Sequence, residues 1–153
     1  MPVEINNLTE NKVDEVWIKQ IIADVLKEEK IKGDKDISLA FVGPGRMQKL
    51  NKSFRKKNRV TDVLSFPESK VKFGKFKIGP TVGFTGLGEI IICLREVKKN
   101  AKRLDLPYEQ ETAKIIIHGV LHLLGYDHEA SEEEAGRMEQ KEQSYLNKLF
   151  SNS

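Results

Sequence analysis

All three histidines of this sequence lie within eleven residues, HGVLHLLGYDH, which run from position 118 to 128. His118 and His122 are four residues apart, and on a helix this spacing places two side chains on one face, one turn apart. Imidazole nitrogens bind zinc at about 2.0–2.1 Å. The pair therefore predicts a shared metal ion, which needs further ligands to complete its coordination.

Gly125 and His128 predict how a third ligand reaches that ion. Glycine adopts the left-handed conformation that ends helices at little cost, so the chain can turn after Gly125 and bring His128 back. Three histidines without a nearby cysteine are typical of a catalytic zinc site, in which water takes the fourth position and its pKa falls to about 7. Nickel, cobalt and iron accept the same ligands. Asp127 could hold an imidazole in place or serve only the turn.

The same histidine spacing occurs in zinc endopeptidases with the motif HExxHxxGxxH, in which the glutamate after the first histidine is the general base. In this sequence that position is Gly119. Glu129 and Glu132 follow the third histidine, where no feature of the sequence places them beside the metal. A metallopeptidase is therefore only a remote alternative.

Basic residues are concentrated away from the histidines. The net charge is only +3, but the segment 49–59 contains six basic residues and no acid, and the segment 70–77 adds four lysines. A local excess of this kind attracts polyanions such as RNA. The commoner meaning of lysine runs is a solvated surface, and composition alone leaves both readings open.

The apolar pattern predicts one α+β domain over residues 1–153, with a single mixed sheet of about four to five strands and about five to six helices. Strands are expected over 2–8, 37–42, 62–66 and 87–93, and a hairpin or loop over 71–84. Helices are expected over 14–30, 46–55, 94–104 and 108–124, and from a capping box at Ser131 to about position 149. The helix 108–124 is apolar almost all round, which predicts a buried central helix carrying the first two histidines.

Cysteine usage and hydropathy indicate the compartment. Cys93 is the only cysteine, so an intrachain disulfide is impossible and a reducing, cytoplasmic setting is expected. Cys93 follows an apolar run and is predicted to be a small core residue. No apolar run approaches the roughly 20 residues of a membrane helix, and no signal peptide is readable. The sequence therefore predicts a cytoplasmic protein without a membrane partner.

The string HGVLHLLGYDH resembles the signature of the YbeY family of bacterial single-strand endoribonucleases. LNKSFRKKNRVTDVLSFPE, from position 50 to 68, resembles the LNxxxR and TDVLSFP block of that family. LGEIIIC, from position 87, resembles its LGDIxIx strand, with Glu89 where aspartate is usual. The order and distances of the motifs also fit, and the resemblance spans essentially the whole chain.

This resemblance implies a zinc-dependent endoribonuclease that is specific for single strands and acts in maturation of the 16S rRNA 3′ end and in ribosome quality control. The implied partners are single-stranded rRNA and the small ribosomal subunit, with room for a small-subunit ribosomal protein and an Era-type GTPase. No DNA substrate is implied. A non-catalytic rRNA-binding assembly factor, stabilised by zinc, would share every one of these features and stays open.

The resemblance also implies roles for particular residues. One Zn²⁺ ion, completed by water, would be held by His118, His122 and His128. Arg55 and His118 match the residues that the family treats as catalytic, and a guanidinium suits the negative charge that develops on phosphoryl oxygens. Four residues around Arg55 could follow the phosphate backbone: Lys52, Lys56, Lys57 and Arg59. Structural or ligand-supporting roles fall to Asp62, Ser65, Gly125 and Asp127.

Overall fold

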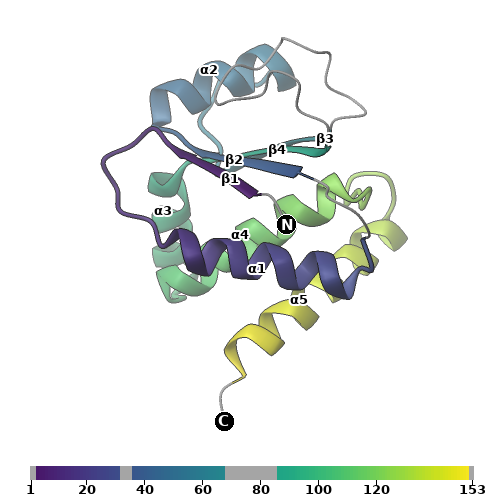
Figure 1. Ribbon diagram of the computed structural model, residues 1–153. Coiled ribbons are helices and arrows are strands. Elements are labelled where there is room, and N and C mark those ends of the chain that lie inside the picture. Colours follow the sequence, from purple (N-terminus) through teal and green to yellow (C-terminus); the bar gives the residue numbers. More distant parts are fainter. Residues whose placement is uncertain (1–2, 32–35, 68–85, 152–153) are drawn as a thin grey trace.

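The computed structural model describes residues 3–31, 36–67 and 86–151 (Figure 1). These residues form four strands and five helices: β1 (Val3–Asn7), α1 (Glu15–Glu28), β2 (Asp36–Phe41), α2 (Pro44–Arg55), β3 (Val63–Pro67), β4 (Gly86–Ile92), α3 (Leu94–Leu104), α4 (Tyr108–Leu123) and α5 (Glu132–Phe150). The lysines at 70–77 and the hairpin or loop expected at 71–84 lie outside the described residues.

The strands form one mixed sheet in the order β1-β2-β4-β3. β1 pairs with β2 and β2 with β4 in parallel, whereas β3 pairs with β4 antiparallel. The α+β class and the single mixed sheet predicted from the sequence are therefore confirmed. β1 and β3 are the edge strands, and the β3 edge is the one beside which the histidines lie.

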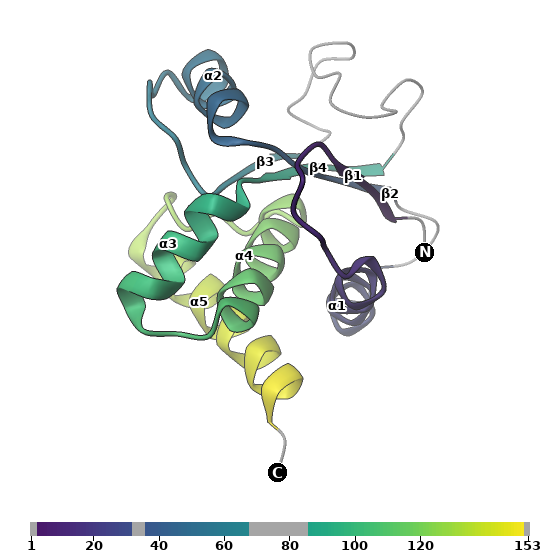
Figure 2. The same cartoon turned by 90° about the vertical axis from the view of Figure 1, so that its left-hand side faces the viewer.

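Helices cover the two faces of the sheet unequally. Figure 2 shows α2 on one face and α1, α3, α4 and α5 on the other. The larger apolar core lies on the four-helix side, and a smaller cluster that includes Met47 and Cys93 lies beneath α2. Cys93 is fully buried, as predicted for a core residue. No helix in the described part of the chain combines the length and apolarity needed to cross a membrane.

The prediction that α2 starts at Arg46 is wrong by two residues, because the helix starts at Pro44. Proline is suited to the first turn of a helix, where its missing N–H would have no partner. The cap predicted at Ser131 is confirmed, and Asp14 forms a second cap that was not predicted. Asp14 caps α1 by accepting a hydrogen bond from the Trp17 N–H, and Ser131 caps α5 by accepting one from the Glu134 N–H.

α4 is the central helix, and ten of its sixteen residues are buried. Gly119 is one of these buried residues and lies against β4. A Cβ atom at Gly119 would lie 2.9 Å from Cγ2 of Ile90 on β4, a distance that real Cβ contacts essentially never show. The absence of a side chain at Gly119 therefore lets α4 pack directly on β4, with His118 beside that contact.

Glu89, on β4, is a buried acid with an exposed fraction of 7%. Burial raises its pKa from 4.5 to about 7. Between these pH values the folded protein holds a proton that the unfolded chain has lost, so stability must fall as the pH rises from 4.5 to 7 and then level off. The shift corresponds to a decrease of up to about 3 kcal/mol in the contribution of Glu89 to the free energy of unfolding.

Glu89→Gln is expected to remove this pH dependence, because the amide stays neutral throughout. Urea unfolding at pH 5 and pH 8 would measure it. We expect the variant to be more stable than the unchanged protein at pH 8, and the two to be closer at pH 5. An equal difference in unfolding free energy at both pH values would contradict a raised pKa at Glu89.

Candidate metal centre

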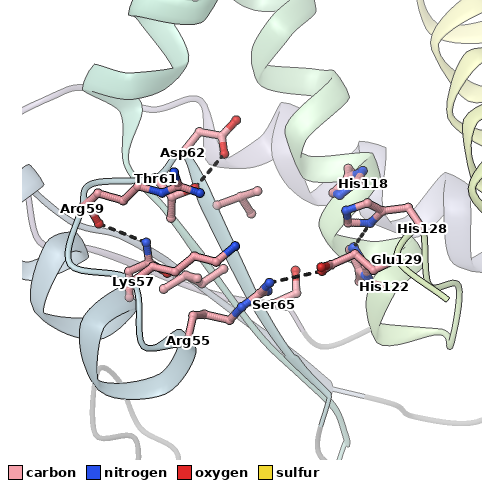
Figure 3. Close-up of a pocket in the computed structure, with 13 residues that line it drawn as sticks. Arg55, Lys57, Arg59, Thr61, Asp62, Ser65, His118, His122, His128 and Glu129 are labelled. Atoms are coloured by element: carbon pink, nitrogen blue, oxygen red, sulfur yellow. Dashed lines mark hydrogen bonds and ion pairs between the residues drawn. The ribbon is translucent and has the colours of Figure 1, made fainter.

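The three histidines converge at the end of α4 (Figure 3). His118 and His122 project from successive turns of the helix, and Gly125 has a φ of +106°, in the region that favours glycine. The chain then turns, and His128 returns toward the other two rings. The ring centroids are 4.7 Å (118–122), 5.1 Å (118–128) and 4.8 Å (122–128) apart. The predicted helix end and the predicted convergence are both present.

The donor atoms of this triad fit a single metal ion. One ring nitrogen from each histidine lies within 4.8 Å of the others, and Nδ1 of His128 lies 2.9 Å from Nε2 of His122. Tetrahedral ligands at Zn–N distances of about 2.0–2.1 Å lie about 3.3 Å from one another. Small side-chain rotations would therefore bring all three nitrogens to ligand distance.

The protonation state of His122 also suits a metal. Burial is the main cause that lowers the pKa of His122 to about 4, and the neighbouring His118 and His128 lower it further. His122 is therefore neutral at physiological pH, which is the form that binds metals. His118 donates a hydrogen bond from Nδ1 to the Glu142 carboxylate. This leaves the lone pair on Nε2 of His118.

Glu142 is a functional candidate that sequence reasoning missed. It lies on the buried face of α5, among the apolar residues Met138, Tyr145 and Leu146. A carboxylate behind an imidazole ligand fixes its tautomer and orientation and raises its basicity. The sequence did contain one signal, because Glu142 occurs at the helical spacing of the apolar residues on the buried face of α5. An acid is rarely buried without a partner.

The histidines form one wall of a cavity of about 220 Å³ beside the edge strand β3. Figure 3 shows the opposite wall, which comes from the end of α2, the segment after it and β3. Its residues include Asn51, Arg55, Lys57, Arg59, Thr61, Asp62 and Ser65. The structure thus brings Arg55, Lys57 and Arg59 to the predicted metal ligands. Lys52 and Lys56 are exposed and do not belong to the described lining of this cavity.

Arg55 reaches the histidine wall through an ion pair. Its Nη2 lies 3.1 Å from Oε1 of Glu129, and the two side chains are 44% and 57% exposed. Glu129 therefore lines the same cavity as the three histidines, a position that no feature of the sequence indicated. A second cavity of about 480 Å³ also includes Arg55, Ser65, His122 and Glu129 in its lining. The ion pair is thus shared by the linings of both cavities.

Asp62 and Asp127 have structural contacts. The Asp62 carboxylate accepts hydrogen bonds from Nδ2 of Asn100 at 3.2 Å and from Oγ1 of Thr61 at 3.4 Å, which connects the start of β3 to α3. Oδ1 of Asp127 accepts from the Glu129 N–H at 2.9 Å. Of the two roles left open for Asp127, the structure shows a contact that serves the turn.

The chain matches known proteins along almost its whole length. A family model described as Endoribonuclease YbeY matches residues 4–150. The protein of that name from Thermodesulfovibrio yellowstonii is 44% identical over 113 residues, which cover 74% of this chain and 66% of that protein. The one from Phytoplasma australiense is 35% identical and the match covers 97% of this chain and 96% of that protein. The one from Chlorobium phaeovibrioides is 37% identical, with 95% and 89% covered.

A solved structure gives the same result for the fold. The solution structure of a protein from Thermotoga maritima superimposes with a TM-score of 0.65 at 28% identity, and the match covers 97% of this chain and 89% of that one. The matches therefore agree in sequence and in three dimensions, and they include the histidine string and the block around Arg55. This chain belongs to the YbeY endoribonuclease family.

Proposed function

We propose that this protein is a zinc-dependent endoribonuclease that cleaves single-stranded RNA in maturation of the 16S rRNA 3′ end and in ribosome quality control. The observation that carries the proposal is the shared cavity, in which three convergent histidines face Arg55, Lys57 and Arg59. A metal site opposite a cluster of cations suits a phosphodiester substrate. The names of the relatives, each an endoribonuclease, support the same reaction.

The residues that line the cavity have different roles in this proposal. His118, His122 and His128 would hold the ion, which when bound would supply Lewis-acid chemistry at the scissile phosphate. Arg55 offers a planar fork of donors to the phosphoryl oxygens, on which negative charge increases in the transition state. Lys57 and Arg59, in the same lining, would hold the adjoining backbone.

The shape of the site favours a single strand as substrate. His118 and His122 are only partly exposed, so the scissile phosphate must enter the cavity to meet them. A flexible single strand can place a phosphate there, whereas a stiff A-form duplex presents its phosphates along a regular surface.

We further propose that the protein acts in the cytoplasm on the small ribosomal subunit, with a small-subunit ribosomal protein and an Era-type GTPase as partners.

Two other functions are tested by the same site. A non-catalytic rRNA-binding assembly factor would use the same three histidines to bind a zinc ion that only stabilises the fold. A metallopeptidase would need a glutamate at position 119, where even a Cβ atom would meet Ile90. The packing of α4 on β4 thus opposes the peptidase by a physical argument that does not depend on the family match.

Metal removal is the direct test of the proposed function. Purified protein is expected to hold one zinc ion per chain by elemental analysis and to cleave a labelled single-stranded RNA. A chelator should abolish cleavage, and zinc should restore it, because the arginine and lysine side chains of the cavity provide no Lewis acid. A matched duplex RNA and casein serve as control substrates. Zinc-loaded protein that binds the RNA without cleaving it would support the assembly factor, and chelator-sensitive casein cleavage would support the peptidase.

A further inference from the structure

Glu29, at the end of α1, accepts three hydrogen bonds from other parts of the chain. Its carboxylate oxygens lie 2.7 Å from the hydroxyl of Tyr126 and 3.0 Å from Nζ of Lys141. The hydroxyl of Tyr145 is the third donor. The Glu29 side chain is only 9% exposed. Three elements therefore meet at one carboxylate: α1, α5 and the segment that follows α4.

Local structure gives no reason for an acid at this position. Glu29 is the C-terminal cap of α1, where the partial negative charge of the helix end disfavours a carboxylate. Burial alone would raise the pKa of Glu29, but the hydrogen bonds from Tyr145, Tyr126 and Lys141 outweigh it, so the pKa falls below its ordinary value. The acid is thus ionised at neutral pH and stabilised by its distant partners.

Tyr126 is the partner that connects Glu29 to the metal centre. It lies in the segment between Gly125 and His128, whose backbone is tied to α4 by the hydrogen bond from the Tyr126 N–H to the Leu121 carbonyl at 3.1 Å. His118 and His122 are held by α4 itself, whereas His128 is exposed and lies outside any helix. The position of the third ligand therefore depends on what holds this segment.

In the part of the chain that the structure describes, two side-chain hydrogen bonds or ion pairs connect the residues on either side of His128 to α1 and α2. One is the Arg55–Glu129 pair, which is exposed, and exposed pairs of this kind contribute little to stability. The other is the Tyr126–Glu29 hydrogen bond, in which the acceptor is charged and almost fully buried. Hydrogen bonds to charged acceptors are roughly twice as strong as neutral ones.

We propose that Glu29 is a positioning residue for the metal centre, which acts through Tyr126 to hold His128 at ligand distance from the other two histidines. This inference rests on the zinc site of the proposed function. Without the Glu29 contact, binding of the metal has to supply more of the ordering of the segment 125–128, and that ordering cost lowers the affinity for the ion.

The test is zinc affinity, measured by competition with a chromogenic chelator at neutral pH. Glu29→Gln is expected to raise the Kd for zinc by about 10-fold or more, as for other groups that support metal ligands. Tyr126→Phe removes a single oxygen and is expected to have a similar effect. The effects of the two substitutions on the zinc Kd should not add in the double variant, because both act on the Tyr126–Glu29 contact.

Glu28→Gln is the matched control. Glu28 is the neighbouring residue and also pairs with α5, through Lys148 at 3.5 Å, but it is half exposed and does not contact the ligand segment. Its variant should bind zinc like the unchanged protein. The melting temperature of the metal-free protein, measured in chelator for every variant, separates lost stability from lost positioning.

Three results would overturn the inference. The first is a lower metal-free melting temperature for Glu29→Gln and Tyr126→Phe with an unchanged zinc Kd, which would make the contact a structural one only. The second is an equal loss of affinity in Glu28→Gln. The third is an absence of zinc binding in the unchanged protein, which would remove the metal of the proposed function as well. The first two results would overturn the positioning role alone.

Discussion

His118→Ala is expected to abolish tight zinc binding and to reduce cleavage of single-stranded RNA by at least about 10³-fold, since both a ligand and the Lewis acid are lost. The ring is one of three histidines that converge on the site, and the two that would remain, His122 and His128, leave its coordination incomplete. Elemental analysis and a labelled-RNA assay measure the two losses. Binding of the same RNA should persist, because Lys57 and Arg59 are untouched.

Glu142→Gln provides a graded comparison for the same site. Its amide keeps an acceptor for the Nδ1–H of His118 but removes the charge that strengthens the ligand. A zinc affinity that is about 10–100-fold weaker is expected, with the His118 ring still present. Zinc bound to His118→Ala as tightly as to the unchanged protein would contradict the assignment of the triad. If His118→Ala instead fails to fold, so that cleavage is lost only together with the structure, the result would favour a zinc ion with a purely structural role.

Arg55→Ala is expected to reduce RNA cleavage by about 10²–10³-fold while zinc binding stays unchanged. Arg55 lines the cavity opposite the histidines and is not a metal ligand. The unfolding free energy should change by less than about 1 kcal/mol, because the only ion pair that the variant is known to lose is exposed. Single-turnover cleavage of labelled RNA, with metal content and urea unfolding measured on the same samples, checks all three expectations.

Two further variants sharpen the test of Arg55. Arg55→Lys keeps the charge but loses the planar fork of donors, so it should recover RNA binding better than cleavage. Arg46→Ala removes an exposed arginine from the first turns of the same helix, outside the described lining of the cavity, and should cleave RNA normally. Equal losses in Arg46→Ala and Arg55→Ala would show a general effect of charge on α2 and would count against a catalytic role for Arg55.

The convergence of the three histidines could be predicted from the sequence because its geometry is local. A helical spacing of four and a glycine turn determine where His118, His122 and His128 point, and the structure has the same arrangement. The approach of Arg55 to them was implied only by the family resemblance. It depends on α2 and α4 lying on opposite faces of the sheet and meeting at the β3 edge, which no local pattern encodes.

The supporting acids could not be predicted for the same reason. Glu29, Glu129 and Glu142 look like ordinary surface residues in the sequence, and each gains its role from a partner far along the chain. Glu142 alone left a detectable sign, an acid in register with a buried helix face. The start of α2 was misplaced because the residues Gly43 and Gly45 suggested a break, whereas Pro44 fits a first helical turn.

The close approach of α4 to β4 at Gly119 has an evolutionary consequence. The histidine spacing is the one found in peptidases, so a single codon change to glutamate would seem to open a path to peptide hydrolysis. That step is blocked, because the new side chain would collide with Ile90 before it could serve any reaction. A smaller residue would have to arise on the strand first, at a cost in core packing. The distance between a helix and a sheet thus limits which chemistry this ligand spacing can support in this fold.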